Sequence, residues 1–137
     1  MGRVVRPLAA AMLAVVCVSG LPAGASSCAL TSGEQVVLRS SDFDPDVLVW
    51  DSRQRAIDYV SGNMKNTAEV LTHTVLSKPG TRAIVISCDP GTSKPRYSAL
   101  AEDTIGIKIT NGPNRGRYGW VSSGDAHTGA AAQMTVQ

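Results

Sequence analysis

The chain has 137 residues, the length of one ordinary domain, and its 13 basic and 11 acidic residues give a net charge of +2. With 3 cysteines, 13 glycines and 7 prolines, the composition excludes a multidomain enzyme, a coiled coil and a collagen-like chain. A charge of +2 is too small to indicate nucleic-acid binding by bulk electrostatics.

The first 25 residues have the pattern of a secretory signal peptide. Arg3 and Arg6 form a basic start, an apolar run extends over residues 8–18, and Ala23-Gly24-Ala25 closes the segment with small residues. This order is typical of an exported chain that is cleaved after Ala25. The apolar run is shorter than the roughly 20 residues that span a bilayer, and residues 26–137 contain no second run of this kind. Cleavage removes both arginines, so the mature chain has no net charge.

Two cysteines, Cys28 and Cys88, remain after cleavage, because Cys17 lies in the signal peptide. In an oxidising compartment they most simply form one disulfide, which closes a loop of about 60 residues. The segment Gly24–Cys28 also resembles a lipobox, in which the cysteine is lipidated and becomes the new N-terminus, although Ala25 stands where Leu is usual. One sulfur cannot serve both purposes. The sequence therefore predicts a periplasmic or extracellular protein, or one lipid-anchored to the envelope at Cys28.

The first half of the mature chain alternates loops with short apolar runs. Residues 26–46 are predicted to form a tether and a turn-rich acidic loop, with a short strand at 36–38. Val47–Trp50 predicts the next strand. Asp51-Ser52 can cap a helix, because each side chain can accept hydrogen bonds from the free amides at a helix start. Gly62-Asn63 is expected to end that helix.

The middle of the chain contains its most regular strand. Residues 67–77 fit both a helix and a strand, and a strand is favoured for their second half. Lys78–Thr81 is a turn in which Pro presets φ and Gly is free to take positive φ. Ala83–Cys88 follows as a strand, and Asp89-Pro90-Gly91 predicts that the chain turns again.

The last part of the chain predicts two strands joined by a glycine-rich turn. Residues 92–104 fit a long loop or a short helix. Isoleucines alternate with other residues over 105–110, which is the period of a half-buried strand. The turn at 111–116 leads into a strand at 117–121, and residues 127–137 are expected to form a flexible tail.

The stretch from Val75 to Ala126 resembles bacterial SH3-like domains, in which a Gly-Trp-Val strand runs into a short 3₁₀ turn. The segments that carry the resemblance are Leu76–Thr81 before Ala83–Ile86, then Ile107-Lys108-Ile109, and finally Gly119–Asp125. The resemblance implies a mainly β fold, a small SH3-like β-barrel over residues 47–126 with one short helical insertion. It also implies a binding or scaffolding module outside the cytoplasmic membrane, often directed at cell-wall peptide, rather than an enzyme.

The candidate ligand-binding residues are aromatic and basic. Tyr118 and Trp120 alternate along one predicted strand and therefore share a face, which Trp50 can join. Arg115 and Arg117 lie in and after the glycine-rich turn, where they favour an acidic partner surface. The aromatic residues form either the core or the floor of a groove, and the sequence leaves both open.

Metal and cofactor chemistry has little support in the sequence. Asp42, Asp44 and Asp46 have the spacing of a calcium loop, but Val47 and Arg53 stand where that loop needs Gly and a bidentate Glu. The two histidines are not at a metal-ligand spacing from the cysteines. We therefore expect a solvated loop, no metal site and no cofactor.

Three functions remain. The first is an exported non-enzymatic binding module for a peptide, a cell-wall fragment or an envelope protein, with no nucleic-acid partner. The second is an accessory subunit or inhibitor, which predicts an exposed apolar patch, for instance on residues 52–76. The third is a small secreted hydrolase that uses Cys88 with His127 and Asp125, which a disulfide at Cys88 would abolish.

Overall fold

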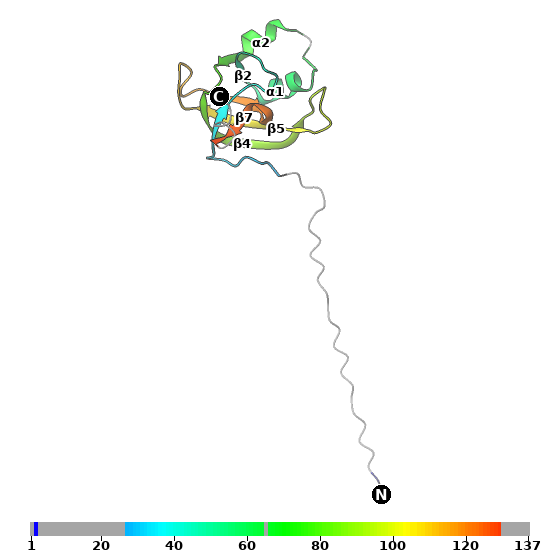
Figure 1. The fold of residues 1–137 in the computed structure, drawn as a ribbon. Coiled ribbons are helices and arrows are strands. Elements are labelled where there is room, and N and C mark those ends of the chain that lie inside the picture. The colour runs from blue at the N-terminus through cyan, green and yellow to red at the C-terminus, as the bar shows by residue number, and fades with distance from the viewer. Residues whose placement is uncertain (1, 3–26, 65, 130–137) are drawn as a thin grey trace.

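A computed structural model describes residues 2, 27–64 and 66–129 of the chain (Figure 1). Seven antiparallel strands form one sheet that curls into a half-barrel, in the order β3-β2-β6-β5-β4-β1-β7, which confirms the prediction of a mainly β fold. The strands are β1 (Gln35–Leu38), β2 (Val47–Trp50), β3 (Thr74–Ser77), β4 (Arg82–Ser93), β5 (Glu102–Ile109), β6 (Tyr118–Ser122) and β7 (Ala126–Thr128).

Two predicted segments fall on residues outside this description. The predicted signal peptide, apart from Gly2, and residues 130–137 of the predicted tail are not among the described residues. Within the described ranges, none of the helices has both the length and the apolar character needed to cross a bilayer.

The central strand β5 supplies the middle of the core. Its Ile105, Ile107 and Ile109 are at most 1% exposed, which confirms the alternation predicted from the sequence. Val85 of β4 and Val121 of β6 are fully buried in the same cluster. Burial of one such side chain contributes about 1.5–3 kcal/mol. The β4-β5-β6 meander is therefore the scaffold on which the loops are mounted.

β4 is longer than predicted, and the expected turn at Asp89-Pro90-Gly91 is wrong. The strand continues to Ser93, and its pairing with β5 shifts register between Asp89 and Ser93. Gly91 takes a φ of 61° at this irregularity. Because Pro lacks a backbone N–H and Gly tolerates positive φ, the Pro-Gly pair produces a bulge within the ladder rather than a reversal of the chain.

The segment between β2 and β3 contains two helices, α1 (Arg53–Val60) and α2 (Ala68–His73), where one short helix was predicted. They lie together at one end of the molecule, beside β2 (Figure 1). The predicted cap is confirmed, because the Ser52 hydroxyl accepts a hydrogen bond from the Arg55 amide at 3.5 Å. The segment that fitted both a helix and a strand forms both, because α2 leads directly into β3. The strand predicted for its second half is confirmed.

The two ends of the described chain meet in the sheet. β1 pairs with both β4 and β7, and its Leu38 is fully buried. After β6 the chain makes a short 3₁₀ helix, η1 (Ser123–Asp125), and enters β7. The sequence did not indicate β7, because its three residues Ala126–Thr128 are too few to show a period.

The sulfur atoms of Cys28 and Cys88 lie at disulfide distance, and their Cα atoms are 6.2 Å apart. Cys28 thereby attaches the segment before β1 to the middle of β4. The predicted pairing agrees with this geometry, and a disulfide would use the sulfur that a lipid anchor needs. This arrangement is compatible with an exported protein.

Candidate functional site

An open cleft of about 600 Å³ lies between the loop at 39–46, helix α1 and the loop at 94–101. Its apolar wall includes the Trp50 and Tyr59 rings, which lie 5.1 Å apart between centroids at an angle of 41°. The remaining apolar residues in the wall are Leu48, Ala56, Val60, Met64 and Val70. We call this feature the acidic cleft, because its carboxylates are Asp42, Asp44, Asp46, Glu102 and Asp125.

Two of these carboxylates lie where β5 begins and where η1 ends. Asp125 accepts hydrogen bonds from the amide (2.8 Å) and the hydroxyl (3.1 Å) of Ser41, which ties the 39–46 loop to η1. Glu102 accepts a hydrogen bond from the Ser122 hydroxyl. Burial raises the pKa of both carboxyl groups above their ordinary values, and the charge of Asp125 raises the pKa of Glu102 further. Their ionised forms are therefore poorly stabilised in this fold.

The loops on either side of the cleft each carry an aromatic residue in full contact with solvent. Phe43 is 98% exposed, and it has a φ of 60°, which is uncommon for a bulky residue. The Ser40 hydroxyl accepts hydrogen bonds from the amides of Asp42 (3.2 Å) and Asp44 (3.3 Å). These two bonds hold the backbone on both sides of Phe43. Tyr97, on the opposite loop, is 100% exposed. Neither ring is explained by core packing.

The position of the Tyr97 loop depends on Arg96. The Arg96 guanidinium donates a hydrogen bond to the Gly62 carbonyl at 2.8 Å, which joins the loop to the end of α1. Gly62 has a φ of 72°, and a Cβ at this position would collide with the Arg96 side chain. Glycine at 62 therefore ends the helix, as the sequence indicated, and also gives Arg96 room to pack.

The predicted aromatic residues divide between core and surface. Trp50 is 3% exposed and lies opposite Trp120 in the β2–β6 pair. Trp120 is half-buried and covers Gly106, since a Cβ at Gly106 would lie 3.2 Å from its ring. Tyr118 is 65% exposed, with the Lys108 amino group 5.4 Å from its ring centroid. The three residues do not form a single exposed groove.

A second pocket, of about 480 Å³, brings together three of the five predicted ligand-binding residues, Trp50, Arg117 and Tyr118. Trp120 and Arg115 do not line it. Its wall also contains Asp51 and His73, whose Oδ2 and Nδ1 atoms are 2.7 Å apart.

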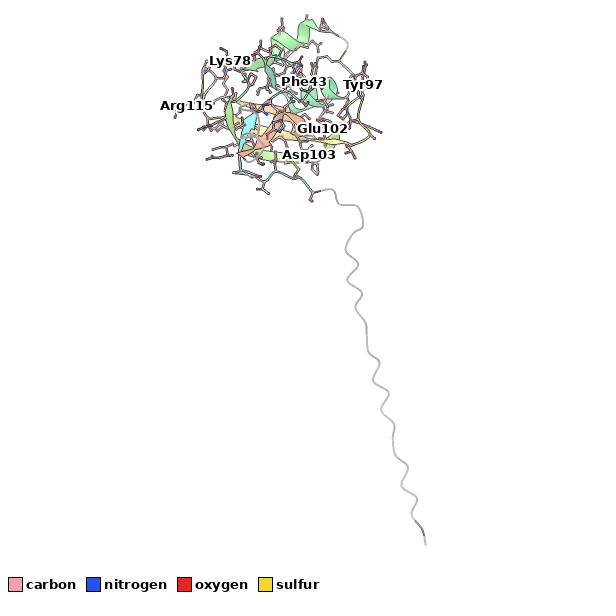
Figure 2. The ribbon with its side chains drawn as sticks, in the orientation of Figure 1. Phe43, Lys78, Tyr97, Glu102, Asp103 and Arg115 are labelled. Carbon is pink, nitrogen blue, oxygen red and sulfur yellow. A yellow bond between two sulfur atoms is a disulfide. The ribbon has the colours of Figure 1, made fainter. Side chains whose placement is uncertain are left out.

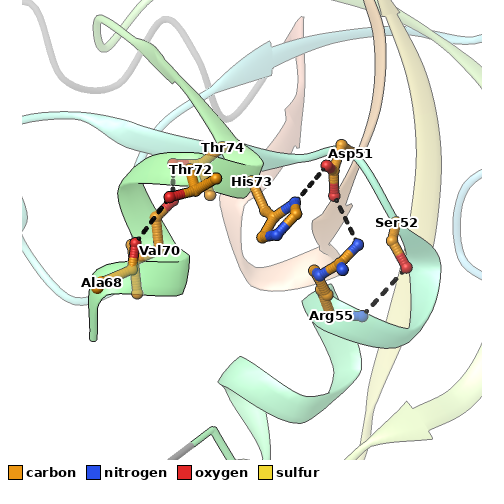
Figure 3. Close-up of polar contacts among 8 residues, drawn as sticks. All are labelled: Asp51, Ser52, Arg55, Ala68, Val70, Thr72, His73 and Thr74. Atoms are coloured by element: carbon orange, nitrogen blue, oxygen red, sulfur yellow. Dashed lines mark hydrogen bonds and ion pairs between the residues drawn. The ribbon is translucent and has the colours of Figure 1, made fainter. Parts of the chain in front are cut away.

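The other oxygen of Asp51 accepts a hydrogen bond from Arg55 at 3.4 Å (Figure 3). This network joins α1 to the α2–β3 corner. Figure 3 also shows why that corner is regular, because the Thr72 and Thr74 hydroxyls donate to carbonyls one turn earlier on α2.

The cysteine pair lies beside the carboxylate of Asp103. Cys28, Cys88 and Asp103 are the one group of potential metal ligands within the described residues, with ligand atoms within 4.8 Å of one another. Asp103 also accepts a hydrogen bond from the Gly91 amide at 2.9 Å. Sulfurs that are joined in a disulfide offer no thiolate to a metal ion or to a substrate.

Tyr59, Tyr97 and Glu102 were not among the sequence candidates, and Asp125 was a candidate only as part of the hydrolase set with Cys88 and His127. The Asp-x-Asp-x-Asp run at 42–46 was the one available signal, but it was considered for calcium alone. Glu102 and Asp125 are separated in the sequence by all of β5 and β6, and only the antiparallel pairing of those strands brings them near each other.

Searches against protein-family models, curated proteins and solved structures find no match to this chain.

Proposed function

We propose that this chain is an exported binding module without catalytic activity, and that it recognises a peptide, a cell-wall fragment or an envelope protein through the acidic cleft. The observation that carries the proposal is an open cleft with an aromatic wall and an exposed aromatic residue on each flanking loop. Ligand sites are typically concave and mostly apolar, with a few polar groups that orient the ligand. The proposed site is therefore the cleft, which neither Tyr118 nor the basic turn lines.

The bacterial SH3-like resemblance belongs to the same proposal. It is supported by the order of elements, in which the β4-β5-β6 meander is followed by a 3₁₀ turn and a final strand beside β1. The pairing of Cys28 with Cys88 also supports binding over hydrolysis, because Cys88 is the nucleophile that the hydrolase hypothesis requires.

The test is retention of the purified oxidised protein by purified cell wall in sedimentation, and by an envelope extract in a pull-down. Tyr97→Ala should weaken retention, whereas Leu100→Ala should not. Leu100 is an exposed residue of the same loop that does not line the cleft, so it is a matched control. The proposal fails if neither experiment retains the protein, or if the two variants are retained equally well.

The accessory-subunit hypothesis has one observation in its favour. Leu71 of α2 and Leu76 of β3 are 74% and 47% exposed, and both lie in the 52–76 segment where an apolar patch was expected. If a partner docks there, Leu71→Ser should abolish capture from the envelope extract, and Tyr97→Ala should have no effect.

A further inference from the structure

The acidic cleft has an apolar wall that needs an occupant with apolar parts. Trp50 and Tyr59 meet on one side, and Met64, from the segment between α1 and α2, and Val70 of α2 also contribute. Tyr97 lines the cleft on one flanking loop, and Phe43 extends the apolar surface beyond it on the other. An open cleft of about 600 Å³ has room for a few side chains of an extended peptide.

The charge around this wall is strongly unbalanced. Five carboxylates line the cleft, although the whole chain has only 11 acidic residues, and Arg96 is the one basic residue that lines it among the described residues. The Arg96 guanidinium is already hydrogen-bonded to the Gly62 carbonyl. A mature chain with no net charge therefore presents a local concentration of negative charge at this concave surface.

Groups inside the cleft respond to this negative charge. Burial is the largest cause of the raised pKa of the Tyr59 hydroxyl, and the charges of Asp44 and Asp42 raise this pKa further. Burial is also the largest cause of the raised pKa of Glu102, and the charges of Asp125, Asp42 and Asp103 raise this pKa further. A cation in the cleft would relieve this repulsion, whereas an anion would increase it.

Basic residues lie on the elements that border the cleft, among them Arg53 and Arg55 on α1 and Lys94 and Arg96 on the 94–101 loop, and also on another part of the surface. Figure 2 shows Arg115 and Lys78 on the side of the molecule away from Tyr97 and Glu102. Because the cleft lining itself holds five carboxylates and one arginine, a partner with positive charge would be attracted to it more than to the side that carries Arg115 and Lys78.

We infer that the occupant of the acidic cleft is an extended polypeptide segment that carries Lys or Arg next to apolar side chains. Its cationic group lies among Glu102, Asp125 and the aspartates of the 39–46 loop, and its apolar side chains pack on Tyr59, Phe43 and Tyr97. This inference rests on the proposed function and specifies the partner's chemistry. It excludes acidic and neutral segments as preferred ligands.

The experiment measures the binding of three end-capped fluorescent peptides by anisotropy. All have the same length and the same apolar residues, and they differ at two positions, which hold lysine, glutamine or glutamate. The lysine peptide should bind, the glutamine peptide should bind roughly tenfold more weakly, and the glutamate peptide should not bind. Affinity for the lysine peptide should fall as the salt concentration is raised from about 50 to 300 mM, because mobile ions screen exposed charges.

Two matched substitutions locate the effect. Glu102→Gln should weaken binding of the lysine peptide roughly tenfold, because it removes a half-buried charge while keeping the side-chain shape. Glu69→Gln makes the same chemical change on exposed α2, outside the cleft, and should leave the affinity unchanged. Asp44→Asn is a second cleft variant, on an exposed loop where misfolding is not expected, and should weaken binding about two- to fivefold.

The outcomes separate this inference from the proposed function. Equal binding of the lysine and glutamine peptides overturns the inference but keeps the proposed function, because the protein would then be a binding module without a preference for charge. Failure of all three peptides while cell wall still retains the protein also overturns it, and failure of both experiments removes the proposed function as well. Concentration-dependent self-association that Glu102→Gln abolishes would identify a second copy of the chain as the occupant, and would overturn the inference too.

Discussion

Replacing both Cys28 and Cys88 with serine would remove the one cross-link that the structure places in its described part. Cys28 lies two residues before Leu30, which is 7% exposed and belongs to the core. Cys88 lies opposite Ile105 in the β4–β5 ladder. The bond therefore closes a loop that contains β1, β2, both helices and β3, which is most of the chain that surrounds the acidic cleft.

The magnitude follows from the size of this loop. The two cysteines are separated by 60 residues, and in the chain-entropy account a closed loop of that length stabilises the fold by about 4 kcal/mol. This is a large part of the 5–15 kcal/mol that is typical of a domain. Since 1 kcal/mol shifts Tm by roughly 4–8 °C in a domain of about 100 residues, the variant should melt about 16–32 °C below the oxidised protein.

The assay is urea unfolding of four samples: oxidised protein, protein with reductant, the double-serine variant and Cys28→Ser alone. The last three should coincide, because each lacks the same bond, and all should lie about 4 kcal/mol below the first. A difference of less than about 1 kcal/mol would refute the loop argument. A native intact mass that shows two free thiols, or the added mass of a lipid at Cys28, would refute the bond itself.

Two further predictions concern the cleft carboxylates and the β2–β6 contact. Because Glu102 and Asp125 have raised pKa values in the folded protein, the fold binds their protons more tightly than the unfolded chain does, so stability should fall as pH rises from about 4 through the raised pKa values. Urea unfolding between pH 4 and 7 should show a shallower fall for Glu102→Gln; an equal slope for variant and parent would contradict this. Gly119→Ala should cost about 1–3 kcal/mol, because the new Cβ would collide with the Val49 side chain and lie 2.9 Å from the Trp50 carbonyl oxygen. Gly129→Ala, with nothing within 4 Å of the added Cβ, is the control for thermal unfolding, and equal melting of the two variants would count against the predicted contact.

Local patterns predicted the elements whose causes are local. The alternation of Ile105, Ile107 and Ile109 reports directly which face of β5 is buried, and Ser52 caps α1 through a contact three residues away. The Asp89-Pro90-Gly91 segment was misjudged for the complementary reason. The segment does favour a turn, but β4 continues to pair with β5 up to Ser93, so the segment forms a bulge within the strand and the chain does not reverse.

The candidate site was predictable only in part. Trp50 lines both pockets, and Arg117 and Tyr118 line the second, so three of the five sequence candidates have a place in a cavity. Arg115 stands on the exposed turn, and Trp120 covers Gly106 within the sheet. Whether an aromatic residue packs in the core or faces a ligand depends on which residues lie opposite its ring. The periodicity along one strand does not give that information.

The sequence by itself determined the mainly β class, the central buried strand and the charge balance of residues 26–137, because each depends on composition or on the order of neighbouring residues. Tertiary structure alone decided where the charge lies. Strand order brings the 39–46 loop, the start of β5 and the end of η1 to one side of the sheet, so five carboxylates share one cleft, although residues 26–137 together carry no net charge. The net charge is a sum over residues and does not depend on where they lie, whereas the electrostatic field at a surface depends on the positions of the charges.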